Sequence, residues 1–432
     1  MELNLVNTPT GFLTLVALVL IFFGCARRLP LGALSLPCMM VLTSFIYFYL
    51  IPVLALAAGD TGYFGMYLGS FRWAHFAVLL YVLGALVAFL VHWRVLSVHP
   101  GAPRRNERQI AKPVFYALWG VVAAGVAFQI LSGKLNLTGA ENYKFATDRE
   151  VAFFTQAYNM MVPLTLILLI RNNFKLWSLV FAAVVVVVFL QIGFRFRIMI
   201  FLTAAVVSFA IARNIKIRVA YALGGAVVAL YLANLIGSLR RYGRGLDLSQ
   251  VDQVAQIGPF TSFAGETGIA YVLAYTAENP LPDLAMFEPW LVGVARLVPS
   301  FIWPDKPTAE YLRHFIAGAQ TKAEGAGVAA SQHVEMLLQF GWISLPILAF
   351  FYFTIATSLI DRLHRLGREA RIAGCAIVPA FFGFYMQTRG YFFQIFADSL
   401  FFFGPLFLVH ISERRSRRAL SARPASPAEL RQ

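Results

Sequence analysis

Two arginines lie in a short segment, Gly193-Phe-Arg-Phe-Arg197, that separates two apolar runs of the chain. Gln191 precedes Arg195 by one helical turn, so both side chains would share one helix face. Guanidinium groups bind phosphate through paired hydrogen bonds, which makes Arg195 and Arg197 a candidate site for an anionic head group. The alternative is that both arginines only extend to lipid head groups from stems buried in the apolar phase.

A second basic cluster, Arg240 and Arg241, follows a later apolar run. Asn234, Ser238 and Arg241 are spaced i, i+4 and i+7, so they would lie on one face of that helix. A polar stripe inside a membrane helix faces a cavity or a neighbouring helix, because lipid offers it no partner. Arg389 is a further candidate, as an isolated arginine between two short apolar runs. For these residues the alternative is a basic anchor at the membrane interface.

A polar helix face begins the apolar run that starts at Gln332. Gln332, Glu335 and Gln339 recur at i, i+3 and i+7, and we expect them to line a substrate cavity. His333 stands beside them, at the expected water boundary, and Glu266 lies in the long polar segment that precedes them. Either group is a candidate general base if its pKa is close to the working pH. The alternatives are a structural histidine and a solvated loop carboxylate.

Metal-binding and nucleotide-binding signatures are missing from the sequence. It has no Asp-x-Asp pair in the external loops, no HExxH, no paired Cys/His spacing and no Walker loop. We therefore expect no metal and no cofactor. In a transfer from a diphosphate donor, fixed arginines would then stabilise the leaving group where other enzymes use a metal.

Composition indicates a membrane protein. The 432 residues are 59% hydrophobic and only 13% charged, whereas soluble proteins carry about 25% charged residues. We predict an all-α, polytopic protein with about eleven membrane helices (a range of about ten to thirteen), since a span needs about 20 apolar residues. The expected spans are 10–26, 31–57, 73–91, 113–131, 151–170, 177–193, 198–212, 219–237, 332–358, 372–388 and 394–411.

The basic residues predict the orientation of these spans. The net charge of +15 does not indicate nucleic-acid binding, because the basic residues concentrate in alternate loops between spans. Such loops are cytoplasmic, which places the N-terminus and the long loop outside. The chain would have four parts: N-terminal membrane helices (1–237), a large and mainly helical external loop that forms a lid (238–331), C-terminal membrane helices (332–411) and a basic, disordered cytoplasmic tail (412–432).

In order and spacing, these features resemble the bacterial oligosaccharide repeat unit polymerases, the Wzy-type O-antigen and exopolysaccharide polymerases. The resemblance covers nearly the whole chain. It rests on the number of spans, the Gly-x-Arg segment at Gly193 to Arg195, and the large external loop late in the chain. The polar helix start before Phe340-Gly-Trp342 and the arginine Arg389 in the last external turn also contribute.

The resemblance implies a C-type glycosyltransferase fold in the bacterial inner membrane, with a metal-independent active site that faces the periplasm. It implies transfer of a growing glycan from undecaprenyl pyrophosphate onto a lipid-linked repeat unit, with a flippase and a chain-length regulator as partners. The donor pyrophosphate would be held by Arg195, Arg197, Arg240, Arg241 and Arg389. An O-antigen ligase shares the donor and the architecture, and a transporter or flippase of lipid-linked sugars is the alternative that is not an enzyme.

Overall fold

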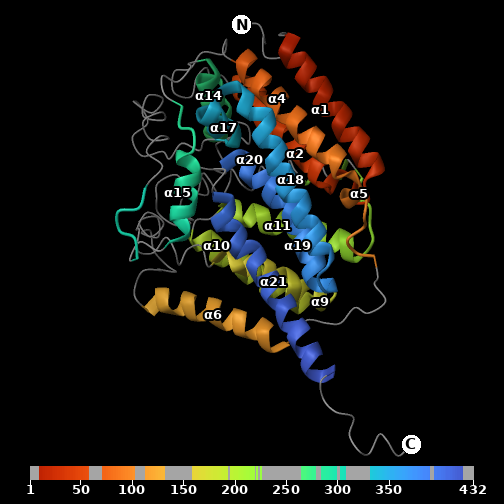
Figure 1. The fold of residues 1–432 in the computed structure, drawn as a ribbon. Coiled ribbons are helices and arrows are strands. Elements are labelled where there is room, and N and C mark those ends of the chain that lie inside the picture. The colour runs from red at the N-terminus through yellow and green to blue at the C-terminus, as the bar shows by residue number, and fades with distance from the viewer. Residues whose placement is uncertain are drawn as a thin grey trace, which may run out of the picture.

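The chain is a bundle of helices (Figure 1). The computed structural model describes residues 9–57, 71–102, 112–131, 158–192, 195–218, 220–221, 224–225, 264–278, 284–298, 302–307, 331–389 and 394–421. These ranges contain helices and no strand, which confirms the all-α class. Four segments in them are long and apolar enough to cross a membrane: Pro9–Arg28, Leu36–Leu54, Arg72–Val91 and Gln332–His364. Shorter apolar helices accompany them, and the set is consistent with the helical membrane protein expected from the sequence.

The helices follow the apolar runs of the sequence, because a chain in lipid must satisfy its backbone hydrogen bonds internally. The α-helices are α1 (Pro9–Arg28), α2 (Leu36–Phe45), α3 (Ile51–Ala57), α4 (Phe71–Val91), α5 (Trp93–Leu96), α6 (Lys112–Leu131), α9 (Met161–Arg171), α10 (Leu176–Ile192), α11 (Arg195–Ala212), α14 (Ala264–Glu278), α15 (Glu288–Leu297), α17 (Gln332–Phe340), α18 (Ser344–His364), α19 (Arg368–Ala380), α20 (Met386–Arg389) and α21 (Gln394–Ser421). Short 3-10 turns form η1 (Gly32–Leu34), η5 (Tyr158–Met160) and η8 (Gly341–Ile343), and π-helical turns form η2 (Ile46–Leu50) and η9 (Phe381–Tyr385).

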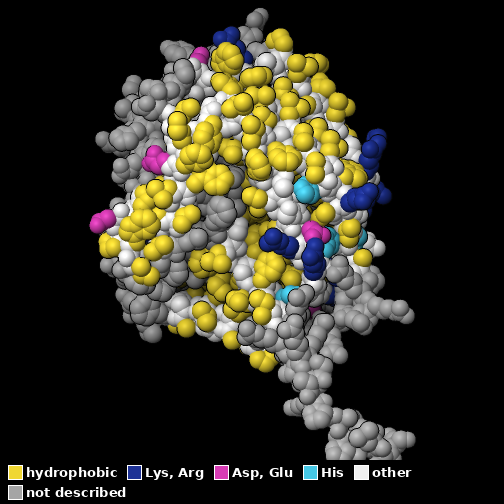
Figure 2. All heavy atoms as spheres, viewed as in Figure 1, with side chains coloured by type: hydrophobic (Ala, Val, Ile, Leu, Met, Phe, Trp, Pro, Cys, Tyr) yellow, Lys and Arg dark blue, Asp and Glu magenta, His cyan; other side chains and the backbone are white. Residues whose placement is uncertain are grey.

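The outer surface of several helices is apolar. Large hydrophobic side chains are exposed on α1, α4 and α10, among them Phe12, Leu20, Leu90 and Val180. Figure 2 shows such side chains spread over much of one face of the molecule. An apolar surface of this extent is typical of helices that contact lipid, since soluble monomers rarely expose large contiguous apolar patches.

The basic loops meet at one end of the bundle. Lys216 follows α11, and its Nζ donates to the carbonyl of Arg27 at the end of α1, at 2.9 Å. The buried Arg371 of α19 donates through Nε to the carbonyl of Pro100, at 2.7 Å, and through Nη2 to that of Ala102, at 3.0 Å. The loops that the charge pattern assigns to one side of a membrane therefore lie together.

Two glycines allow close helix packing. Gly84 of α4 faces the backbone of α18, where an added Cβ would lie 2.7 Å from both the carbonyl carbon and the Cα of Pro346. Gly383 of η9 faces α2, where a Cβ would lie 2.8 Å from the Cβ of Met39. Small residues at such crossings let helix backbones approach, which is a main source of helix association in membranes.

The expected external lid is partly a core element. In α14, residues Ile269 to Ala274 are all buried, and the helix packs against α3, α4 and α17. The run Ile-Ala-Tyr-Val-Leu-Ala is apolar on every side, and a helix of that kind is buried rather than laid on a surface. The tail also differs from the expectation, since α21 continues to Ser421, and its residues 412–421 include no proline.

The expected span 332–358 is interrupted at Gly341, which separates α17 from α18. Gly341 has φ 70° and ψ −153°, a region that essentially only glycine adopts. The backbone N–H groups of Ala285 and Met286 donate to the carbonyls of Leu338 and Gln339, at 2.8 and 3.0 Å, and so satisfy the C-terminal end of α17. The polar face therefore belongs to a separate helix, α17, which ends before α18 begins.

Replacing Gly341 by alanine should destabilise the protein by about 1–3 kcal/mol, because the side chain would be held in a strained backbone conformation. The expected result is a lower midpoint of thermal unfolding in detergent. Gly125→Ala in α6 is the matched control: its Cβ would meet nothing within 4 Å, so it should not destabilise the fold. Equal midpoints for the two variants would contradict the interruption at Gly341.

Candidate functional site

A buried polar network joins four segments that are far apart in the sequence. Arg197 lies in the first turn of α11, at the end of that helix opposite Lys216. Its Nε donates to Oδ1 of Asn159 in η5. The Asn159 Nδ2 donates to Oδ1 of Asp398 near the start of α21, at 3.5 Å, and the Tyr385 hydroxyl of η9 donates to Oδ2 of Asp398, at 3.3 Å. The network links η5, α11, η9 and α21.

Burial explains why these groups are paired. Asn159 and Asp398 are each 1% exposed, while Arg197 and Tyr385 are half-buried. A buried carboxylate is costly unless it is hydrogen-bonded and balanced by positive charge. Asn159 accepts one of the five N–H donors of the guanidinium group, which orients Arg197. The site can therefore present a fixed cation to an anionic ligand.

Arg195 and Arg389 belong to the same end of the bundle. Arg195 opens α11, two residues before Arg197, and Arg389 ends α20, four residues after Tyr385. Arg240 and Arg241 lie outside the described residues altogether. Other expected site residues belong to described helices, but their side chains lie outside the described set: Gln191, Arg195, Glu266 and Arg389.

The polar face of α17 points into the protein. Gln332, Glu335 and Gln339 are all 0% exposed. The Tyr81 hydroxyl of α4 donates to Oε1 of Gln332, at 3.0 Å, and the Trp290 Nε1 of α15 donates to Oε1 of Gln339, at 3.2 Å. These contacts connect α17 to one helix of the N-terminal half and to one helix of the expected lid.

His333 lies inside the bundle and not at the water boundary where it was expected. Its ring centroid is 4.1 Å from that of Tyr81 and 4.9 Å from that of Phe48, and the side chain is 0% exposed. Neither ring nitrogen has a hydrogen-bond partner among the described residues. A general base must reach the proton that it takes, so this packing favours a structural role for His333.

A His333→Phe protein should keep its activity and its thermal stability. Phenylalanine fills the same space between Tyr81 and Phe48 and leaves no buried nitrogen without a partner. Turnover and the unfolding midpoint are the measurements. Tyr81→Phe is the control, because it removes the hydrogen bond to Gln332 and should destabilise by about 1 kcal/mol. If His333→Phe folds normally but has lost its activity, the ring acts in the chemistry.

The segment formed by η9 and α20 connects the Arg197 network to α17. The Ser44 hydroxyl of α2 donates to Oε1 of Gln387, at 3.2 Å, two residues after Tyr385 of the network. The two π-helical turns touch, since the ring centroids of Tyr47 in η2 and Phe384 in η9 lie 6.4 Å apart. α20 also packs against α17. Because π-helical turns are frequent at functional sites, this connection is itself a candidate feature.

Sequence reasoning did not single out Asn159, Tyr385 or Asp398. One signal was present for Asp398, which is the sole acidic residue of the apolar run 394–411. An ionisable residue within a membrane segment is a functional-site hypothesis by default. Asn159 and Tyr385 carry no comparable signal, because polar or amphipathic side chains are ordinary near the ends of such segments.

No group of three or more His, Cys, Asp or Glu side chains gathers in the described ranges of the chain. No family model, no curated protein and no solved structure matches the chain.

Proposed function

We propose that the chain is an oligosaccharide repeat unit polymerase of the bacterial inner membrane, with about eleven membrane helices, a C-type glycosyltransferase fold and an active site that faces the periplasm. The observation that supports it best is the orientation of Arg197 by Asn159, within a network that includes Asp398 and Tyr385. This guanidinium group lies at the end of α11 opposite the basic loops, where the polymerase proposal needs a phosphate ligand.

The donor in this proposal is a glycan on undecaprenyl pyrophosphate, whose apolar tail stays in the bilayer. The acceptor hydroxyl attacks the anomeric carbon, the bond from that carbon to the pyrophosphate oxygen breaks, and the pyrophosphate leaves with the electron pair. Arg197 stabilises the negative charge that develops there, because a preorganised cation acts most strongly in the transition state. On the basis of the sequence pattern, the proposal places four further arginines at this phosphate site: Arg195, Arg240, Arg241 and Arg389.

The acceptor is the non-reducing sugar of a lipid-linked repeat unit. Its hydroxyl proton passes to a general base, for which the proposal names Glu266, in the first turn of α14. His333 is the weaker choice because its ring is fully buried between Tyr81 and Phe48. A flippase that supplies the repeat unit and a chain-length regulator are the partners that this activity requires.

The test is elongation by the purified protein. In detergent with a lipid-linked repeat unit, the expected product is a ladder of polymers together with released undecaprenyl pyrophosphate. Movement of the lipid across vesicles without elongation would instead indicate a transporter. In cells, loss of a polymerase leaves single capped repeat units, whereas loss of an O-antigen ligase leaves none.

A further inference from the structure

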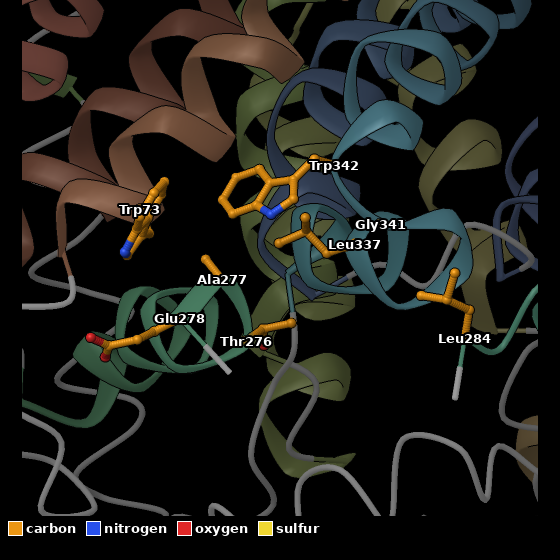
Figure 3. A pocket seen from close by; sticks show the side chains of 8 residues that line it. All are labelled: Trp73, Thr276, Ala277, Glu278, Leu284, Leu337, Gly341 and Trp342. Carbon is orange, nitrogen blue, oxygen red and sulfur yellow. The ribbon is translucent and has the colours of Figure 1, made fainter. Parts of the chain in front are cut away.

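A pocket of about 280 Å³ lies at the junction of α4, α14, α17 and η8 (Figure 3). Trp73 at the start of α4 and Trp342 in η8 stand on one side, and the end of α14 lies across from them. Leu337 of α17 lies at the back, between the two sides. α18 runs from here towards the basic loop at Arg365 to Arg371, so the pocket opens at the opposite end of the bundle.

The tryptophan side of the pocket is a packed aromatic wall. The ring centroids of Trp73 and Trp342 lie 5.8 Å apart, and that of Phe76 lies 5.4 Å from that of Trp342. The Arg72 guanidinium lies 5.2 Å from the Trp73 ring centroid and holds that indole by a cation–π contact. Trp73 is still 37% exposed and Trp342 is half-buried, so both can contact a ligand. Rigid aromatic surfaces of this kind pack against flat C–H faces at low entropic cost.

The other side of the pocket offers hydrogen-bond acceptors. The exposed Glu278 side chain ends α14, and the carbonyls of the last turn of a helix also accept hydrogen bonds. The partial negative charge at this helix end opposes a second anion, and none of the described residues that line the pocket is a lysine or arginine. The chemistry therefore suits a neutral ligand that has hydroxyl donors along its edge and C–H groups on its face.

We infer that this pocket binds one neutral sugar ring, stacked on Trp342 and Trp73 with its hydroxyls directed to Glu278. The volume of about 280 Å³ lies just below the range of about 300–1,000 Å³ typical of ligand pockets, so the pocket admits a single ring and not an oligosaccharide. Naming that ring as the terminal sugar of the acceptor rests on the proposed function, whereas the sugar site itself does not. Leu337 shares α17 with Gln339 and His333, so this helix connects the pocket to the buried polar face.

Saturation-transfer NMR on the full chain in detergent tests the site. The probes are free glucose, galactose, rhamnose and N-acetylglucosamine, each added alone, with tetramethylammonium as a cationic probe. At least one sugar should receive saturation, strongest on the C–H protons of one ring face. Trp342→Ala should weaken the binding of that sugar about tenfold, because the variant loses one aromatic contact to the sugar ring. Trp177→Ala, at an indole that is 53% exposed and does not line this pocket, should leave binding unchanged.

Glu278→Gln keeps the shape of an exposed side chain, so it tests the same site if the tryptophan variant fails to fold. It should weaken sugar binding several-fold. The inference is overturned if no sugar receives saturation, if only tetramethylammonium does, or if the pocket variants bind sugar as well as Trp177→Ala. Elongation is scored separately: a protein that elongates but binds no sugar here refutes this site alone, and sugar binding without elongation refutes the polymerase proposal alone.

Discussion

Arg197→Lys protein should form no long polymer although it folds and accumulates normally. Lysine keeps the positive charge but has no planar fork, so it loses both the contact from Nε to Asn159 and the bidentate contact to a phosphate. Loss of one such group from a preorganised site costs about 10²–10³ in rate. The measurement is the elongation rate of the purified protein, with the polymer ladder from cells as support.

Arg213→Lys is the matched control for this experiment. Arg213 follows the other end of the same helix and is exposed. Its Nη2 donates one long hydrogen bond to the carbonyl of Asn173, at 3.5 Å, and its guanidinium lies 5.9 Å from the Phe209 ring centroid. It should elongate at the wild-type rate. Polymer of normal length from the Arg197→Lys protein would refute the proposed role of Arg197 at the donor pyrophosphate. If Arg197 only ties helices together, its replacement should lower the unfolding midpoint, and activity should fall only as far as the folded fraction does.

Gly84→Ala should prevent the protein from folding stably. The added Cβ would meet the backbone of Pro346, at 2.7 Å from its Cα, and no side-chain rotation relieves such a contact. α4 and α18 would have to separate along their shared interface. Overpacking of a well-packed interior costs about 1–3 kcal/mol and sometimes more, and a contact with backbone belongs at the upper end of that range. The measurements are the yield of monodisperse protein and its unfolding midpoint.

The control for Gly84 is Gly24→Ala in α1, where a Cβ would meet nothing within 4 Å. This variant should be as stable as wild type or slightly more stable, because alanine favours helix over glycine. A Gly84→Ala protein with an unchanged midpoint would show that α4 and α18 do not cross as closely as described. Activity is not needed for this comparison, so it holds whatever reaction the protein performs.

Much of the helical framework could be predicted because each apolar segment has to satisfy its backbone hydrogen bonds within itself. The expected spans 10–26, 73–91 and 177–193 correspond closely to α1, α4 and α10. Apolar runs of this length must satisfy their own backbone hydrogen bonds, and helix is the local way to do so. The break at Gly341 between α17 and α18 could not be predicted in this way. The positive φ of Gly341 depends on how the segment 284–286 caps α17, and hydropathy does not report that contact.

The candidate site, like the fold, could be predicted from the sequence only in part. From the sequence by itself came the all-helical framework, the grouping of the basic loops and the choice of Arg197 as a candidate site residue, because local apolar runs and isolated charges decide these. Only the tertiary structure decided that Arg197 binds Asn159, which in turn binds Asp398, that α14 is a core helix, and that His333 packs between aromatic rings. The physical reason is that a buried polar group is stable only beside a partner, and its partner here is supplied by a segment far away along the chain.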